Sequence, residues 1–509
     1  MTASYLTTPI YYANDVPHIG HAYTTIAADA IARYRRLRGD DVFLLTGTDE
    51  HGVNIERIAA ERHIAPQAQV DAVAAKFAEL WTGLDISYDR FIRTTEPAHR
   101  RAVLAFWERL RASGDLYRAV YEGTYCARCE AYYQPEELHD QQDCPVHRLA
   151  CDRVTEENWF FRLSRYQDAL EQLVRDTDFV QPATRRNEIL GVLGQGLRDF
   201  SVTRRLVRWG VPVPDASEEV IYVWVDALAN YLTGVGYPDD TDTFERYWPA
   251  ELHLVGKEII RFHCLYWPAL LLAAGLPLPR RVFAHGWLTL DGKKISKTTG
   301  NVVDPHALVA ELGADAVRYY FLRAIPFGHD GDFTRAAIGA RYRADLANDF
   351  GNLVQRATSL AARHPWIASG EGGPTGADER RLRDGAGRLA ERVAEAFDAL
   401  ALHEAAAAVG SFVSEVNRYV DSTAPWTLAR DGDGERLSAV LAHIVEATRL
   451  AAWHYAPFIP RAAAEAHCRL AGRPPAPGGG SFDPARTAVV RVGPPLFPRL
   501  PEQVGSGGC

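Results

Sequence analysis

Hydrophobic and polar positions follow two different periods near the start of the chain. Residues 5–12 are mostly β-branched or aromatic, which predicts a strand. Residues 20–38 instead carry apolar side chains at helical spacing, at Ala22, Ile26, Ala30, Ile31, Tyr34 and Leu37. A second strand is predicted at 42–45, and another helix follows Gly52. Strands that alternate with helices predict a parallel sheet covered by helices, with a ligand site at the carboxyl ends of its strands.

The pattern changes twice further along the chain. Residues 116–215 contain short segments with clustered cysteines and several prolines, which predicts an insertion. Strands are predicted again at 220–225, 252–255 and 282–284, so the insertion is expected to split the sheet. From about residue 305 to about residue 470 the chain is rich in Ala and Leu at helical spacing, which predicts a helical domain.

Composition and charge exclude several classes of protein. No apolar run approaches the roughly twenty residues that a membrane span needs. The N-terminus lacks the basic-then-apolar pattern of a signal peptide, so we expect a cytoplasmic protein with no membrane contact. A net charge of −9 argues against indiscriminate binding of nucleic acid. Two arginine clusters are either local RNA contacts or solvated helix faces: Arg33, Arg35, Arg36 and Arg38, and Arg198, Arg204, Arg205 and Arg208.

Four of the seven cysteines lie within residues 126–151. Cys126 and Cys129 form one short knuckle, and Cys144 and His147 form a second, a spacing that can complete a tetrahedral zinc site. Cys151 is a rival to His147 as the fourth ligand. Because four protein ligands leave no open position, we expect one structural zinc ion per chain.

Two distant segments suggest phosphate chemistry. The segment Pro17-His18-Ile19-Gly20-His21 lies where a predicted strand passes into a helix, and helix N-termini bind phosphate. His18 and His21 could donate hydrogen bonds to a triphosphate, while Gly20 leaves room for a base. A metal site and ordinary packing are the alternatives for paired histidines. Downstream, residues 291–301 form a lysine-rich polar loop that could stabilise charge on a triphosphate, with a solvated turn as the alternative.

Together these segments resemble the HIGH and KMSKS signatures of class I aminoacyl-tRNA synthetases, in the same order and at similarly wide separation. The second signature is Lys294-Ile295-Ser296-Lys297-Thr298 here, with Ile for the usual Met and Thr for the last Ser. Residues 8–14, 47–52, 222–228 and 256–263 resemble the methionyl-tRNA synthetase family in particular, and the similarity runs from residue 5 to about residue 470.

The resemblance implies an enzyme of the bacterial type with a single zinc knuckle. It would use ATP, with Mg²⁺, to convert L-methionine to methionyl-adenylate and would transfer the methionyl group to tRNA(Met), including initiator tRNA. The residues implied as catalytic are His18, His21, Lys294 and Lys297. Those implied to bind ATP are His18, Gly20, His21, Gly256, Glu258 and Lys297.

The methionine pocket is likewise implied by the resemblance. Its residues are Ile10, Tyr12, Asp49, Trp224, Ala227, Leu228, Tyr231, Ile259, Phe262, His263 and Trp267. Asp49 would hold the α-ammonium, aromatic rings suit a polarizable thioether, and either Tyr12 or His263 could donate a hydrogen bond to the sulfur. The alternative is that Trp224, Phe262 and Trp267 are ordinary core aromatics.

Anticodon recognition is expected in the helical domain. Asn348, Asn352 and Arg356 recur every four residues and share one helix face. The segment 417–426, which ends in Trp426, resembles the anticodon-reading element of the family, so Asn352, Arg356 and Trp426 are expected to bind the anticodon. A polar surface stripe beside a buried tryptophan is the alternative.

The predicted fold is α/β: a Rossmann-type parallel sheet that is split by a zinc-binding connective insertion and followed by an α-helical anticodon-binding domain. The catalytic halves are 1–115 and 216–295, the insertion 116–215, the KMSKS and stem-contact region 296–347, the anticodon domain 348–470, and the linker and tail 471–509. No tRNA-binding domain follows, which favours a monomer.

Two other functions are compatible with these patterns. One is a class I synthetase for another apolar amino acid, although the long editing insertion of the isoleucine, valine and leucine enzymes is absent. The other is a paralogue that binds tRNA without charging it. Methionine occurs only at position 1. The chain could therefore be synthesised with charged initiator tRNA and without charged elongator tRNA(Met). The alternative explanation for the missing internal methionines is chance drift in composition.

Overall fold

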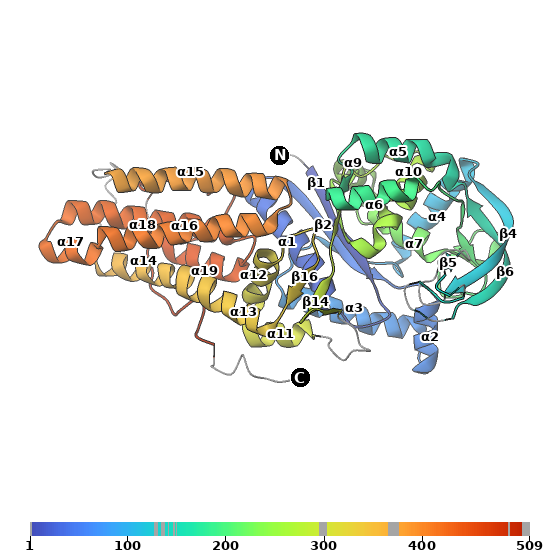
Figure 1. Ribbon diagram of the computed structural model, residues 1–509, viewed down its shortest axis with the longest axis horizontal. Helices are drawn as coiled ribbons and strands as arrows, with labels where there is room; N and C mark the ends of the chain where they lie inside the picture. The colour runs from blue at the N-terminus through green and yellow to red at the C-terminus, as the bar shows by residue number, and fades with distance from the viewer. Residues whose placement is uncertain are drawn as a thin grey trace.

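The computed structural model describes residues 3–126, 131–133, 138–140, 142–145, 148, 150–294, 303–364, 376–486 and 489–500. The molecule is elongated, with a helical bundle at one end, a parallel sheet in the middle and a β-rich insertion at the other end (Figure 1).

A six-stranded sheet in the order β3-β2-β1-β12-β13-β7 forms the centre, and all its neighbouring strands are parallel, which confirms the predicted sheet. Its strands are β1 (Ala3–Tyr12), β2 (Asp41–Asp49), β3 (Arg90–Arg93), β7 (Val180–Gln181), β12 (Leu252–Gly256) and β13 (Val282–His285). The strand order reverses between β1 and β12. In open α/β sheets this switch point opens the crevice in which ligands bind.

Helices cover both faces of the sheet. The first half contributes α1 (Ile19–Arg38), α2 (Val53–Glu61), α3 (Pro66–Gly83) and α4 (Pro97–Ala112). The second half contributes α7 (Val223–Leu228), α8 (Asn230–Thr233), α9 (Thr241–Tyr247) and α10 (Trp267–Ala273), with a π-helical turn at Phe262–Tyr266. Helix α1 ends at Gly39, whose φ of 92° is the left-handed conformation that favours glycine after a helix.

The insertion contains a four-stranded antiparallel sheet in the order β5-β4-β6-β8. Its strands are β4 (Leu116–Cys126), β5 (Ala131–Tyr133), β6 (Asp152–Phe161) and β8 (Phe200–Ser201), and the helices α5 (Gln167–Asp176) and α6 (Ala183–Leu193) accompany them. The short strand β7 lies within the predicted insertion 116–215, yet it pairs with β13 in the main sheet.

The predicted strand at 220–225 is wrong. Strand β11 (Ala216–Ile221) ends early and belongs to a small antiparallel sheet with β9 (Thr203–Arg204) and β10 (Pro212–Val213). Helix α7 then begins at Val223. A short apolar run does not distinguish a strand from a buried helical turn, because both bury consecutive side chains.

The predicted helical region contains nine of the helices found in the described part of the chain. They are α11 (Pro305–Leu312), α12 (Ala314–Ala324), α13 (Arg335–Arg341), α14 (Asn352–Arg363), α15 (Ala377–Asp398), α16 (Leu402–Thr423), α17 (Pro425–Asp431), α18 (Gly434–Tyr455) and α19 (Pro460–Ala471). One strand interrupts them: β16 (Gly331–Phe333) pairs with β14 (Leu288–Leu290), which also pairs with β15 (Lys293–Lys294). Among the described residues, no helix is both long and apolar enough to cross a membrane.

Two apolar cores hold the molecule together. The two cores lie on opposite faces of the sheet. One includes Phe106, Phe161 and Trp267. The other runs from α1 through α12 into the bundle without a break and includes Ile26, Phe321 and Leu450. The bundle is therefore packed onto the sheet rather than attached by a flexible linker.

Candidate active site

The two histidines of the first signature lie at the start of α1, beside the switch point of the sheet. His18 is the N-cap residue, and its Nδ1 accepts a hydrogen bond from the Gly20 N–H at 3.1 Å. The Nδ1 of His21 accepts from the His18 N–H at 3.3 Å. Since both Nδ1 atoms accept, each neutral ring carries its proton on Nε2. The two rings stack with their centroids 3.6 Å apart.

His21 is a neutral donor rather than a cation. Burial lowers its pKa well below the usual value, and the adjacent His18 lowers it further. Gly20 lies directly under the His18 ring, because a Cβ at this position would be 3.0 Å from His18 Cε1. A larger residue would displace the ring that caps the helix.

The opposite side of the switch point is formed by the end of β12. A Cβ on Gly256 would lie 2.4 Å from Glu258 Oε1, so glycine makes room for this carboxylate. Glu258 accepts a hydrogen bond from Trp287 Nε1 at 2.9 Å. Lys257 Nζ lies 4.1 Å from the Trp287 ring centroid and 2.6 Å from Asp330 Oδ1. The sequence analysis did not predict a role for Trp287. Its position just after a buried strand could have indicated one, because the ligand site is expected at the carboxyl ends of the strands.

The predicted methionine pocket divides by exposure. The partly exposed residues are Ile10, Tyr12, Asp49, Trp224, Ile259 and Phe262, and the buried ones are Ala227, Leu228, Tyr231, His263 and Trp267. Trp224 and Phe262 come from α7 and the π-helical turn, and their rings stack 3.6 Å apart at an angle of 4°. Trp267 is fully buried and contacts Tyr231 and Phe106, so it belongs to the core as well as to the predicted pocket.

His263 has no donor left for a thioether. Its Nδ1 lies 3.0 Å from the Ile259 carbonyl oxygen and therefore donates, so its Nε2 accepts from the Tyr231 hydroxyl at 2.7 Å. Burial lowers the pKa of His263 to about 4, so the ring is neutral. This corrects the expectation that His263 could donate to the sulfur.

A buried carboxylate joins two of the sequence motifs. Asp226 accepts from His51 Nδ1 at 2.6 Å and from His99 Nε2 at 2.9 Å. Burial would raise the pKa of Asp226, but the contacts with His51 and His99 outweigh this effect and lower it to about 2. The ionised Asp226 thereby ties α7 to the segment after β2. Sequence analysis singled out both motifs but did not predict this contact.

Several predicted residues of the loop and the zinc site lie outside the described residues, namely Cys129, His147 and Lys297. Lys294 ends β15, but its side chain is not described. Cys126 and Cys144 are buried. Burial, together with the neighbouring Cys126 and Cys144, raises the pKa of Cys151 to about 12, so the three cysteines lie near one another. Within the described ranges, no group of three or more side chains is arranged to hold a metal ion.

Five arginines of the two clusters contact other side chains of the same chain. Arg33 pairs with Asp29, Arg35 with Glu251 and Arg36 with Asp89. Arg204 is buried, with its guanidinium 3.9 Å from the Tyr222 ring centroid, and Arg205 pairs with Glu219. Arg33, Arg35, Arg36 and Arg204 are therefore held by contacts within the chain, whereas Arg205 stays exposed beside its partner.

Trp426 lies on α17, at the end of the bundle farthest from the sheet (Figure 1). Helix α16 ends at Thr423, Ala424 adopts a left-handed φ of 41°, and Pro425 begins α17. This break directs the tryptophan outward, and 49% of Trp426 is exposed. The alternative of a buried tryptophan is therefore wrong. Asn352 is exposed on α14, and Arg356 Nη2 lies 2.5 Å from Asp421 Oδ1 on α16.

The fold and the site define a class I aminoacyl-tRNA synthetase. A family model described as class I tRNA synthetases (M) matches residues 4–156 and 150–358. A second, described as the anticodon binding domain of methionyl tRNA ligase, matches residues 370–474. The chain belongs to the methionine–tRNA ligase, or methionyl-tRNA synthetase, family.

Relatives and solved structures agree with this assignment. The methionine–tRNA ligase of Caldanaerobacter subterraneus subsp. tengcongensis is 46% identical over 90% of this chain and 72% of that protein. That of Nostoc sp. is 45% identical over 91% of this chain and 89% of that protein. The structure of Mycobacterium tuberculosis methionyl-tRNA synthetase in complex with methionyl-adenylate is 42% identical, with a TM-score of 0.91, and the match covers 98% of this chain and 100% of that chain.

Proposed function

We propose that this chain activates L-methionine with ATP and transfers it to the 3′ end of tRNA(Met), including initiator tRNA. The observation that carries the proposal is the likeness, across 98% of the chain, to an enzyme solved with methionyl-adenylate. The partly exposed stacked pair Trp224 and Phe262 supports it, because aromatic rings suit a thioether side chain.

The reaction has two steps. A carboxylate oxygen of methionine attacks the α-phosphorus of ATP, the bond from that phosphorus to the bridging oxygen breaks, and pyrophosphate leaves. A ribose hydroxyl of the terminal adenosine then attacks the methionyl carbonyl carbon and loses its proton, an ester bond forms, and AMP leaves with the electron pair of the broken anhydride C–O bond.

The proposed catalytic groups stabilise charge instead of transferring protons. The Nε2–H groups of His18 and His21 would donate to phosphate oxygens, and Lys294 and Lys297 would neutralise charge that develops in the transition state. ATP would arrive as its Mg²⁺ complex, and the metal would neutralise the pyrophosphate that leaves. Gly256 and Glu258 would bind the ATP ribose, and Asp49 the α-ammonium of methionine.

Pyrophosphate exchange measured with each of the twenty amino acids tests this function. We expect methionine to support exchange far better than the other amino acids do. Exchange that depends on a different apolar amino acid would identify a synthetase of other specificity. Absence of exchange, with tRNA binding retained, would identify a paralogue that does not charge tRNA.

Replacement of Lys297 tests the proposed charge stabilisation. Lys297→Ala is expected to lower the single-turnover rate of adenylate formation by about two orders of magnitude, since its charge acts mainly in the transition state. The dissociation constant for methionine should stay near that of the wild type. An unchanged adenylation rate would exclude this role.

We also propose one structural zinc ion per chain, held by Cys126, Cys129, Cys144 and His147, with Cys151 as the rival fourth ligand. Cys126→Ser combined with Cys129→Ser should release about one zinc ion per chain and destabilise the insertion. Metal analysis of His147→Ala and Cys151→Ala, side by side, identifies the fourth ligand as the residue whose loss lowers zinc content. A wild-type protein without zinc would contradict the site.

Anticodon reading, assembly and location complete the proposal. Asn352, Arg356 and Trp426 would hold unstacked anticodon bases, the two polar side chains at base edges and the indole by stacking. We propose a monomer that acts in the cytoplasm. Light scattering of the purified protein would measure its mass directly.

A further inference from the structure

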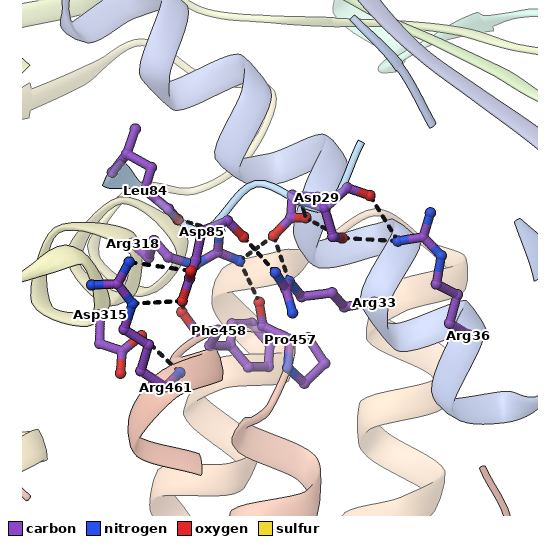
Figure 2. Close-up of polar contacts among 11 residues, drawn as sticks. Asp29, Arg33, Arg36, Leu84, Asp85, Asp315, Arg318, Pro457, Phe458 and Arg461 are labelled. Carbon is purple, nitrogen blue, oxygen red and sulfur yellow. Dashed lines mark hydrogen bonds and ion pairs between the residues drawn. The ribbon is translucent and has the colours of Figure 1, made fainter. Parts of the chain in front are cut away.

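The guanidinium of Arg318 lies at the junction between the sheet and the helical bundle (Figure 2). Arg318 belongs to α12, and its Nη2 is 2.6 Å from Asp29 Oδ2 on α1. Both side chains are completely buried. The junction therefore contains an ion pair that water does not reach.

The other contacts of Arg318 are with backbone carbonyls from two more segments. Nη1 donates to the Leu84 carbonyl, after α3, at 3.2 Å. Nη2 donates to the Pro457 carbonyl at 2.9 Å, and Nε donates to the Phe458 carbonyl at 3.3 Å. The last two carbonyls lie between α18 and α19. One side chain thus connects α1, the start of the loop that leads to β3, and the bundle.

The carboxylate of Asp29 is equally engaged. Oδ2 accepts from Arg33 Nε at 2.7 Å, and Oδ1 accepts from the Ser87 N–H at 2.7 Å and from Ser87 Oγ at 2.6 Å. Arg36 Nη1 donates to Ser87 Oγ at 2.8 Å, which extends the network one turn further along α1. Arg33 and Arg36, which follow the signature histidines on α1, therefore belong to the junction.

Contacts at the rim strengthen the same junction. Arg461 of α19 pairs with Asp85, with Nε 2.7 Å from Oδ2. Asp315 of α12 accepts from the Ala462 N–H at 2.7 Å. Nearby, the Tyr34 ring of α1 stacks on Phe397 of α15 with the centroids 3.9 Å apart.

Such a pair is better suited to fixing geometry than to adding stability. Burial of two charges costs about as much free energy as their attraction recovers, and apolar side chains of similar size often stabilise a core as well. A guanidinium differs in that its planar fork fixes the directions of several hydrogen bonds at once. Here those directions set the position of the turn between α18 and α19 relative to α1.

We propose that Arg318, together with Asp29, is a positioning residue for tRNA charging. It fixes the angle between the bundle and α1, so that a tRNA bound near α17 places its 3′ end at the histidines that begin α1. This inference rests on the proposed function. Adenylate formation requires no tRNA, so a change of this angle should impair transfer to tRNA without impairing activation.

Arg318→Lys tests the inference, because lysine keeps the positive charge but lacks the planar guanidinium that fixes several hydrogen-bond directions at once. Arg449→Lys is the matched control: Arg449 is also buried, pairs with Glu446 and donates to the Gly479 and Ser481 carbonyls, but it lies wholly within the bundle and its C-terminal extension. For Arg318→Lys we expect kcat for charging to fall about tenfold or more, since small misplacements of a reacting group are costly. Methionine-dependent pyrophosphate exchange and affinity for an anticodon stem–loop should match the wild type.

Three results would overturn the proposal. Exchange and charging that fall together indicate general destabilisation, and unchanged charging indicates no positioning role. The same selective loss in Arg449→Lys would mean that the effect is not specific to the junction.

If Arg318→Lys fails to fold, a second variant tests the proposal. Arg461→Gln at the exposed rim should lower charging alone, by about threefold, and wild-type charging by this variant would overturn the proposal. A wild-type chain without exchange would instead contradict the proposed function.

Discussion

At the scale of single residues, the most informative feature is the state of the buried histidines. Burial lowers the pKa of His263 to about 4 and that of His467 to about 4. In the active site, neutrality leaves His21 a hydrogen-bond donor through Nε2. The charges in the site are therefore expected to come from the lysines, the metal ion and the nucleotide. The neutral histidines are expected to orient the phosphates through hydrogen bonds.

His454 allows these depressed pKa values to be tested away from the site. It is buried on α18, neither ring nitrogen has a hydrogen-bond partner, and burial lowers its pKa to about 3. Because the unfolded histidine takes up a proton below about pH 6.5 and the folded one does not, stability should fall as the pH drops. At about pH 5 the loss from one such histidine is about 2 kcal/mol.

His454→Leu should remove this share of the acid sensitivity. The midpoint of thermal unfolding, measured between about pH 7 and about pH 5, should fall less steeply for the variant than for the wild type. Pyrophosphate exchange near neutral pH should not change. His63→Asn, at an exposed position, is the control and should keep the wild-type slope. Equal slopes for all three proteins would contradict the assignment.

At the scale of elements, breaks in helices decide which side chains reach solvent. The left-handed Ala424 and the following Pro425 separate α16 from α17 and expose Trp426. A continuous helix would have rotated this side chain to a different direction. The ring can then act as a stacking platform, which contributes about 1 to 3 kcal/mol per base.

Trp426→Ala should therefore reduce tRNA charging by about tenfold or more, while methionine-dependent exchange and thermal stability stay near those of the wild type. Trp426→Phe, which keeps a stacking ring, should retain most of the charging. Leu206→Ala is a control at another exposed apolar side chain, 63% exposed, and should leave charging unaffected. A loss of both activities in Trp426→Ala would indicate a structural role instead.

At the scale of the whole molecule, a shared core joins the proposed adenylation site at the start of α1 to the bundle that carries the proposed anticodon site. The core that includes Ile26, Phe321 and Leu450 runs from α1 through α12 into the bundle, so the two proposed sites are held in one body. The net charge of −9 and the arginines paired within the chain agree with tRNA contacts that are few and local.

A double perturbation tests whether Trp426 contacts an anticodon base directly. A single base change in the anticodon should lower charging about as much as Trp426→Ala does. The two defects combined should be smaller than their product, because both delete the same contact. Steady-state charging of both tRNAs by both enzymes measures this. Full multiplication would place Trp426 outside the contact with that base.

The sequence alone determined those features that depend on neighbours along the chain. Periodicity located β1, α1, β2 and most of the bundle, because the pattern of buried and exposed positions in an element follows from the order of apolar and polar residues along it. The two signatures and the pocket motifs indicated class and substrate, because the chemistry of a triphosphate and of a thioether limits the side chains that serve it.

Only the tertiary structure decided which partner each side chain meets. It assigned residues 220–225 to the end of β11 and to α7, and it brought the Tyr231 hydroxyl to His263 Nε2 across 32 positions of sequence. It placed Arg318 of α12 against both Asp29 of α1 and the turn between α18 and α19. Spacing along a chain encodes helix faces and strand faces, but a buried charge is satisfied by whichever distant segment the fold brings to it.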